Sequence, residues 1–212
     1  MKQTIIELPI PRLKSNVSLE DTISRRRAVR RYCSKPLLLS QLSQILWSGQ
    51  GITGTREFRA APSAGATYPL EIHVVIGKQC IIASEAKQDS QELQAGIYHY
   101  EPNSHSLSLH RSGDLRPYLA GAALDQEFIA EAPADIVICA LYQRTSHRYG
   151  RRGERYVHME VGHVGENIHL QAVALGLSTV EIGAFDDDAV AKVLGAQQQL
   201  RPLYIMPVGK AV

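Results

Sequence analysis

Cysteines and long apolar runs are scarce in this chain of 212 residues. Its three cysteines are an odd number and form no CxxC pair, which argues against a disulfide framework and against a cysteine-based zinc site. No apolar run approaches the roughly 18 residues that a membrane-spanning helix needs, and the N-terminus lacks the apolar centre of a signal peptide. These absences predict a cytoplasmic protein without a membrane partner.

Net charge is also small. The formal charge of +2 is too small to predict nucleic-acid binding, so an anionic ligand would have to be held by a local cluster of cations. Apolar residues make up 44% of the chain, which fits one globular domain with a core large enough to fold. We expect residues 1–17, a proline-containing stretch without periodicity, to form an N-terminal arm, and residues 18–212 to form the domain.

Motifs of metal-dependent and hydrolytic enzymes are absent or wrongly placed. The pairs Glu160-x-x-His163 and Glu166-x-x-His169 have the spacing found in di-iron sites, but both lie on one predicted helix. They are about 120° apart around its axis, so they cannot converge on one metal pair. Neither GxSxG nor HExxH occurs. The sequence therefore predicts no metal site and gives no motif for hydrolysis.

A long helix near the C-terminus is the main structural prediction. From Val157 to Leu175 apolar residues recur at helical spacing without a proline, and Gly176 is expected to end the helix. Glycines at positions 150 and 153 are expected to interrupt the basic stretch before it. A short strand at 177–182 and a helix ending at Leu194 are expected to follow. On pattern alone, this arrangement also fits the central helix of any α/β domain.

Further strands are indicated by apolar alternation and by apolar runs. We expect a strand at 70–76, a hairpin at 97–110, a buried strand starting at Ala134 and a last strand at 203–208. Residues 49–54 match GxGxxG, but they follow a predicted helix instead of a strand. This context excludes a dinucleotide-binding turn at that position.

A cluster of arginines is the sharpest charge feature. A helix is expected to start at Ser18 and continue to Tyr32, and its last turns would hold five arginines. One interpretation is a solvated basic face near the negative end of the helix dipole, worth roughly 0.3 to 1 kcal/mol per charge. The other is a phosphate grip, since one charge-assisted hydrogen bond contributes about 1.5 to 3 kcal/mol. The five arginines are Arg25, Arg26, Arg27, Arg30 and Arg31.

Five segments occur in an order that resembles one family. They are SRRRAVRRY, PSAGATYPLEIHVV, RYGRRGERYVHMEVGHVGENIHLQAVALGL, EIGAFDDDAV and LYIMPVG. Together they resemble the nitroreductase superfamily across residues 18–209, and more narrowly its SagB-type branch, whose better-known members oxidise azoline rings in peptides. The resemblance implies an α+β FMN-binding fold with a central, mostly antiparallel sheet flanked by helices. It also implies an intertwined homodimer, a long helix at the dimer interface and two FMN sites shared between subunits.

The resemblance assigns the cofactor-binding residues. Arginines 26, 27 and 30 would hold the phosphate and the pyrimidine edge of FMN, and Ala28, where many relatives have serine, could contribute only its backbone. The small-residue loop would reach the ring of the partner subunit's FMN, although a plain loop before a strand is the alternative. The turn after the short strand would lie beside the ring, and one basic residue follows the last strand. These positions are Arg26, Arg27, Ala28, Arg30, Pro62, Ser63, Ala64, Gly65, Ile182, Gly183, Ala184 and Lys210.

Arg148 and Tyr149 match the segment in which azoline oxidases carry a Lys-Tyr pair. Arginine keeps the charge of lysine but does not release a proton near neutral pH, so Tyr149 would be a donor or a positioning group. The sequence thus predicts an FMN-dependent oxidoreductase that transfers two electrons, with a small-molecule or peptide-derived substrate and NAD(P)H as one candidate donor. The alternative is a flavin-binding or scaffold protein without turnover, a degenerate partner in a multi-enzyme complex.

Overall fold

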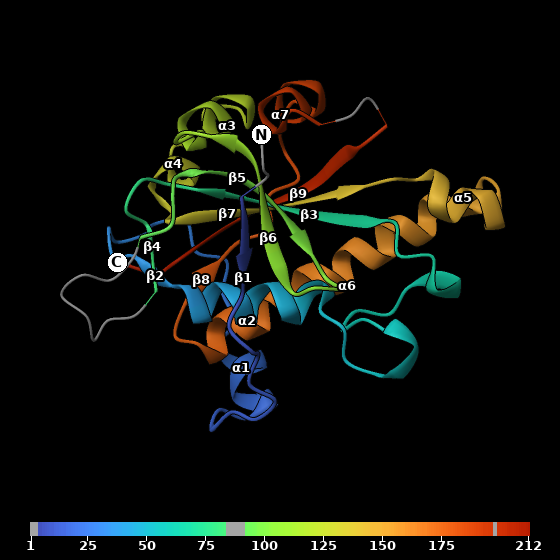
Figure 1. Cartoon of the computed structure of the whole chain (residues 1–212), viewed down its shortest axis with the longest axis horizontal. Coiled ribbons are helices and arrows are strands. Elements are labelled where there is room, and N and C mark those ends of the chain that lie inside the picture. Colours follow the sequence, from blue (N-terminus) through green and yellow to red (C-terminus); the bar gives the residue numbers. More distant parts are fainter. Residues whose placement is uncertain (1–3, 84–91, 197–198) are drawn as a thin grey trace.

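The computed structural model describes residues 4–83, 92–196 and 199–212, and its centre is a seven-stranded sheet (Figure 1). Every paired strand in this sheet is antiparallel to its neighbour, as the predicted fold requires. In spatial order the strands are β1 (Ile5–Glu7), β6 (Ser106–Ser112), β5 (Gly96–Glu101), β3 (Leu70–Ile76), β7 (Ala134–Ala140), β9 (Arg201–Gly209) and β8 (Ser178–Thr179). A separate parallel pair joins β2 (Leu37–Leu38) and β4 (Ile81–Ile82).

The central strands β3 and β7 are buried on both faces of the sheet, which explains why they are apolar runs. All seven residues of β7 are buried. On one face pack α2 (Leu39–Gln50) and the long α6 (Arg152–Ala174), and on the other α3 (Arg116–Ala122), α4 (Phe128–Glu131) and α7 (Asp187–Leu194) (Figure 1). The predicted strands at 70–76, 134 onward and 203–208 are confirmed, as is the hairpin.

The first helix, α1 (Leu19–Arg25), is shorter than predicted. Its N-cap is Ser18, as expected, but it ends at Arg25, and the chain up to Cys33 is extended. The prediction of helix through Tyr32 was wrong because these residues hydrogen-bond to β8 and to the end of the chain, partners far away in sequence. The arginines after Arg25 are therefore placed along a sheet edge and not on a helix.

The basic stretch before α6 also differs from the prediction. Residues Gln143–Tyr149 form a helix of their own, α5, and α6 begins at Arg152. Gly150 does break the chain, with a φ of 58°, but Gly153 is buried inside α6. A Cβ atom at Gly153 would lie 2.7 Å from the Cα atom of Ser146, so glycine is needed where α6 crosses α5.

We expect Gly153→Ala to destabilise the protein by about 1 to 3 kcal/mol, because the added methyl group meets backbone that cannot move independently. The better helix propensity of alanine, about 1 kcal/mol, offsets only part of this cost. Urea unfolding measures the change. Gly121→Ala is the control, since a Cβ atom there has only the Asp125 side chain at 3.9 Å and should not destabilise the fold. Equal effects of the two substitutions would contradict the close packing of α5 on α6.

Part of the segment expected to be an arm, residues 1–17, contributes to the sheet. Residues Ile5–Glu7 form β1, which pairs with β6. Residues 8–17 then lead to α1, which lies against α6 (Figure 1). Within the described ranges, no helix has both the length and the apolar character that crossing a bilayer requires.

Candidate functional site

The segment after α1 brings several predicted residues to one edge of the sheet. The Val29 amide donates to the Thr179 carbonyl in β8 (3.1 Å), and the Cys33 amide donates to the Lys210 carbonyl (2.9 Å). Between them, the buried Tyr32 hydroxyl donates to the Pro207 carbonyl (3.2 Å). The edge therefore holds Arg26, Arg27, Ala28, Arg30 and Lys210 next to one another along two neighbouring stretches of chain.

The three predicted arginines at this edge differ in their hydrogen bonding. Arg27 turns back onto the main chain, where its guanidinium donates to the carbonyls of Ser24 (3.1 Å) and Arg26 (2.6 Å). In the part of the chain that the structure describes, the guanidinium groups of Arg26 and Arg30 have no hydrogen-bonding partner. Arg30 is exposed and Arg26 half-buried. Two guanidinium groups are thus free to bind an anion such as a phosphate.

A buried histidine of α6 hydrogen-bonds to the backbone of the arginine segment that follows α1. The His169 side chain has no exposed area, and its ring nitrogens face the Glu181 carboxylate (2.8 Å) and the Arg27 carbonyl (3.1 Å). Nδ1 of the ring faces the carboxylate and Nε2 faces the carbonyl, so each nitrogen has an acceptor oxygen within hydrogen-bonding distance. Burial alone would raise the pKa of Glu181, but the hydrogen bond and charge of His169, with the nearby Arg26, lower it.

These groups also bear on the predicted absence of a metal site. The ligand atoms of Glu166, His169 and Glu181 lie within 4.8 Å of one another, a grouping that was not predicted because Glu181 is outside the helix. Both nitrogens of His169 are already engaged in hydrogen bonds. These hydrogen bonds hold the Arg27 carbonyl and the Glu181 carboxylate in place.

The predicted turn at Ile182, Gly183 and Ala184 follows Glu181 directly. Ile182 pairs with Ile205 of β9 through two backbone hydrogen bonds of 2.9 and 3.0 Å, and Gly183 and Ala184 are exposed. The Ala184 carbonyl accepts a hydrogen bond from the Gln126 side chain (3.0 Å), so the turn is exposed but anchored at both ends. Because Arg26 is close enough to Glu181 to lower its pKa, the arginine edge and this turn belong to one cluster.

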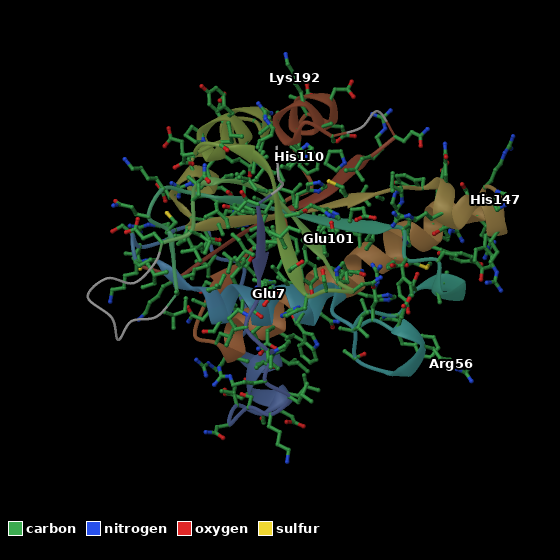
Figure 2. The ribbon with its side chains drawn as sticks, viewed as in Figure 1. Glu7, Arg56, Glu101, His110, His147 and Lys192 are labelled. Atoms are coloured by element: carbon green, nitrogen blue, oxygen red, sulfur yellow. The ribbon has the colours of Figure 1, made fainter. Side chains whose placement is uncertain are left out.

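A second cluster forms around the loop at Pro62–Gly65. The Arg148 guanidinium donates to the Gly65 carbonyl (3.2 Å), and a Cβ atom at Gly65, which has a φ of 59°, would lie 2.5 Å from the Tyr149 hydroxyl. The neighbouring His147 points away from the loop into solvent (Figure 2). The structure thus places Arg148 and Tyr149 of α5 beside Gly65, the last residue of the predicted loop Pro62, Ser63, Ala64 and Gly65.

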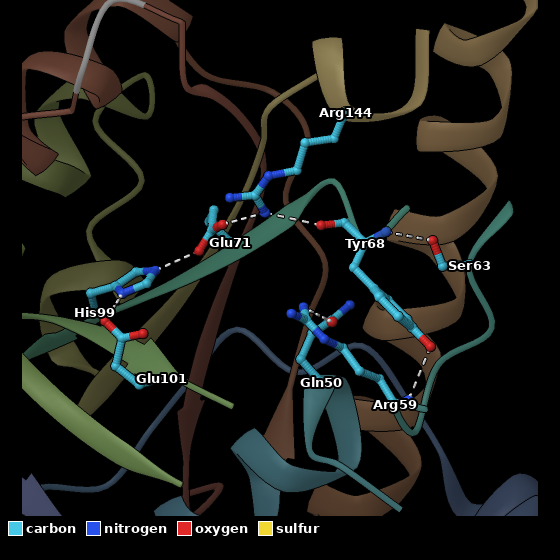
Figure 3. Close-up of polar contacts among 8 residues, drawn as sticks. All are labelled: Gln50, Arg59, Ser63, Tyr68, Glu71, His99, Glu101 and Arg144. Carbon is cyan, nitrogen blue, oxygen red and sulfur yellow. Dashed lines mark hydrogen bonds and ion pairs between the residues drawn. The ribbon is translucent and has the colours of Figure 1, made fainter. Parts of the chain in front are cut away.

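A polar network continues from this loop across β3 (Figure 3). The Tyr68 amide donates to Ser63 Oγ (2.9 Å), and Arg144 donates to the Tyr68 carbonyl (3.0 Å) while pairing with Glu71. Glu71 in turn bonds His99 (2.6 Å). Burial favours the neutral form of Glu71, but His99 and Arg144 outweigh it and lower the pKa of Glu71. The network connects the loop to α5 and to β3 through Arg144.

The two clusters lie at different heights of α6. Glu160, which is next to Ser63, and His169, which is next to Arg27, are nine residues apart, or about 14 Å along the helix axis. One chain therefore presents two half-sites, and the predicted cofactor-binding residues do not form a single contact cluster within it.

The family follows from comparison with known proteins. Residues 23–210 match the model of the nitroreductase family. The chain belongs to the nitroreductase family.

Relatives of this nitroreductase-family protein cover its whole length. It is 44% identical over 207 residues to MJ1384 of Methanocaldococcus jannaschii, itself a candidate nitroreductase, with 98% of each chain aligned. A crystal structure of a candidate nitroreductase from Ralstonia eutropha superposes with a TM-score of 0.81, at 26% identity and with 98% and 90% of the chains covered. These matches confirm the predicted family and the predicted fold.

A third relative bears on the branch. The microcin B17-processing protein McbC of Escherichia coli is 29% identical over 163 residues, which are 71% of this nitroreductase-family chain and 54% of McbC. The chain thus spans about half the length of McbC. This match supports the predicted resemblance to the SagB-type branch.

One buried acid of this nitroreductase-family site was missed as a functional residue. Glu160 of α6 is 2% exposed, and its Oε1 atom has no hydrogen-bonding partner among the residues that the structure describes. Burial raises the pKa of Glu160 to about 7, against the opposing effects of the Ser63 hydroxyl and the Arg59 charge. The spacing to His163 suggested only a metal ligand, whereas the informative signal was an acidic residue on the apolar face of the helix.

Proposed function

We propose that this nitroreductase-family protein is an FMN-dependent oxidoreductase that works as a homodimer with shared sites. The observation that carries the proposal is the pair of guanidinium groups, Arg26 and Arg30, that have no hydrogen-bonding partner among the described residues and lie beside the anchored turn at Ile182–Ala184. A dianionic phosphate and an anionic ring edge are the ligands that such a pair favours. FMN, when bound, supplies two-electron transfer, and the protein supplies binding, orientation and charge.

The division of labour among this chain's residues follows from the two half-sites. Arg26 and Arg30, with the backbone of Ala28 and the charge of Lys210, would hold the phosphate and the pyrimidine edge. The exposed turn at Gly183–Ala184 would lie beside the ring. The Pro62–Gly65 loop, carrying Arg148 and Tyr149, would close the site of the partner subunit, because it lies about 14 Å along α6 from the arginine edge of its own chain.

The exposed face of α6 supports the homodimer. Met159 is 52% exposed on this helix, and a Cβ atom at Gly162 would meet no atom within 4 Å. His163 and Glu166 continue the same exposed face. A long helix with an exposed methionine and a free glycine suits close packing against a second copy.

The substrate class is a small molecule or a peptide-derived group. Similarity to McbC favours the peptide-derived group. However, Arg148 stands where azoline oxidases carry lysine, and an arginine does not serve as a base near neutral pH. That departure, together with Ala28, also favours a second candidate function, a flavin-binding scaffold protein without turnover.

Purified protein tests the proposed function directly. We expect a yellow protein that releases FMN on denaturation, has the mass of two chains by light scattering, and is bleached by NADPH under anaerobic conditions. A dimer that binds FMN but shows no reduction by any donor and no reoxidation by a quinone or a thiazoline peptide would favour the scaffold function. A colourless protein that cannot be reconstituted with FMN would rule out both.

A further inference from the structure

Glu160 is a buried carboxyl group that forms no ion pair in the described ranges. It lies on α6 against the Pro62–Gly65 loop. Arg59 is the charged group that faces it, and the Arg59 guanidinium is already bound to the Gln50 side chain (2.7 Å) and stacked over the Tyr68 ring (4.6 Å). Gln50, which is 1% exposed, likewise keeps an unpartnered Nε2 atom. A carboxyl in such surroundings is stable when it can take up a proton.

Ser63 connects this carboxyl to the surface of the loop. Its Oγ atom accepts a hydrogen bond from the Tyr68 amide (2.9 Å; Figure 3), so the hydroxyl hydrogen is free to donate to the Glu160 carboxylate. A hydroxyl oxygen has two acceptor positions, so when Glu160 is protonated its O–H can donate to the second position and the Ser63 hydroxyl hydrogen is then free to donate to a ligand. Ser63 can therefore pass a proton between Glu160 and a bound molecule.

We infer that Glu160 is the proton-holding residue of this site, which exchanges a proton with the substrate through the Ser63 hydroxyl. The inference rests on the proposed function, since the loop must lie against the FMN site of the partner subunit. It also accounts for Arg148: the residue that replaces the usual lysine cannot release a proton, and Glu160 is the neighbouring group that can.

The step balances for an organic acceptor such as a quinone. A bound FMN reduced by NAD(P)H would supply a hydride, two electrons and a hydrogen nucleus, to one acceptor atom. The other acceptor oxygen takes the Ser63 hydroxyl proton, and Ser63 recovers a proton from the Glu160 carboxylic acid, which becomes a carboxylate. In the opposite direction, the same two groups remove the proton that an oxidised substrate releases. Glu160 acts through Ser63 and is therefore a positioning and proton-storing residue.

The experiment compares wild type with Glu160→Gln, Ser63→Ala and the control Glu154→Gln, an exposed acid on the same helix. The first readout needs no cofactor: besides the band of the buried, protonated Asp135, infrared spectroscopy of FMN-free protein should show a second protonated carboxyl band that disappears as the pH rises through about 7. This band should be missing in Glu160→Gln and present in the control. The second readout is reoxidation of NADPH-reduced protein by benzoquinone from pH 5.5 to 9, followed by flavin absorbance.

We expect the wild-type reoxidation rate to fall above pH 7, because the acid form of Glu160 is the donor. Glu160→Gln should be slower at pH 6 on the order of 100-fold and should lose this pH dependence, Ser63→Ala should behave similarly, and Glu154→Gln should match wild type. A pH profile that survives in Glu160→Gln, or a carboxyl that is ionised throughout the range, overturns the inference while FMN binding stands. A protein that binds no FMN overturns the proposed function and this role with it.

Discussion

Alanine in place of both Arg26 and Arg30 is expected to remove FMN from the purified protein while leaving the fold intact. Each guanidinium lacks a protein partner in the described part of the chain, so each could give its hydrogen bonds to the phosphate or the ring edge. One charge-assisted hydrogen bond is worth about 1.5 to 3 kcal/mol, so losing two should weaken binding on the order of 10² to 10⁴-fold. Stability should change by less than about 0.5 kcal/mol, because neither side chain is part of the core.

Titration calorimetry of FMN-free protein with FMN and with riboflavin measures this effect and locates its source. Riboflavin lacks the phosphate, so wild type should prefer FMN and the double variant should bind both ligands with similar, weak affinity. Arg25→Ala is the matched control, since Arg25 is on the same segment but is paired with Asp21 (2.9 Å) and exposed. If the double variant kept its affinity and its preference for FMN, the anion would have to bind elsewhere.

The sheet and the long helix were predictable because their signals are local. Residues 134–140 are apolar at nearly every position, as a strand covered on both faces requires, and the apolar spacing from Val157 to Ile168 is that of one helix face. The extended segment 26–33 was not predictable in this way. Its backbone partners are Thr179 and Lys210, and no pattern within the segment announces a partner so far along the chain.

The sequence predicted which segments belong to the candidate site, but it did not predict which of their residues are in contact. The motifs named the arginine edge, the small-residue loop and the turn, yet nothing in the spacing placed Arg148 against Gly65 or His169 against Arg27. Glu160 was available from the sequence, since it falls among the apolar positions Val157, Val161 and Val164. An acid on the apolar face of a helix is a stronger indication of function than its spacing to a histidine.

Asp135 gives the second large effect, on stability. It lies in the middle of the sheet on β7, has no exposed area, and neither carboxyl oxygen has a hydrogen-bonding partner. Burial raises the pKa of Asp135 well above its ordinary value; the Arg116 charge opposes this shift and Asp114 adds to it. Arg116 cannot fully compensate, because its guanidinium is bound to Asp114 (2.6 Å) and to the Ala132 carbonyl (2.7 Å).

The folded protein therefore keeps a proton on Asp135 that the unfolded chain releases above pH 4. Since the folded pKa is the higher one, the stabilising contribution is complete below the unfolded pKa and is lost as the pH rises towards the folded pKa. The slope is about 1.4 kcal/mol per pH unit. Asp135→Asn keeps the shape of the protonated acid without the titration, so its stability advantage over wild type should grow as the pH rises above the unfolded pKa, until the pH reaches the folded pKa. Urea unfolding at several pH values measures this difference, with the exposed Asp125→Asn as control; parallel curves for wild type and Asp135→Asn would mean that Asp135 is ionised in the folded state.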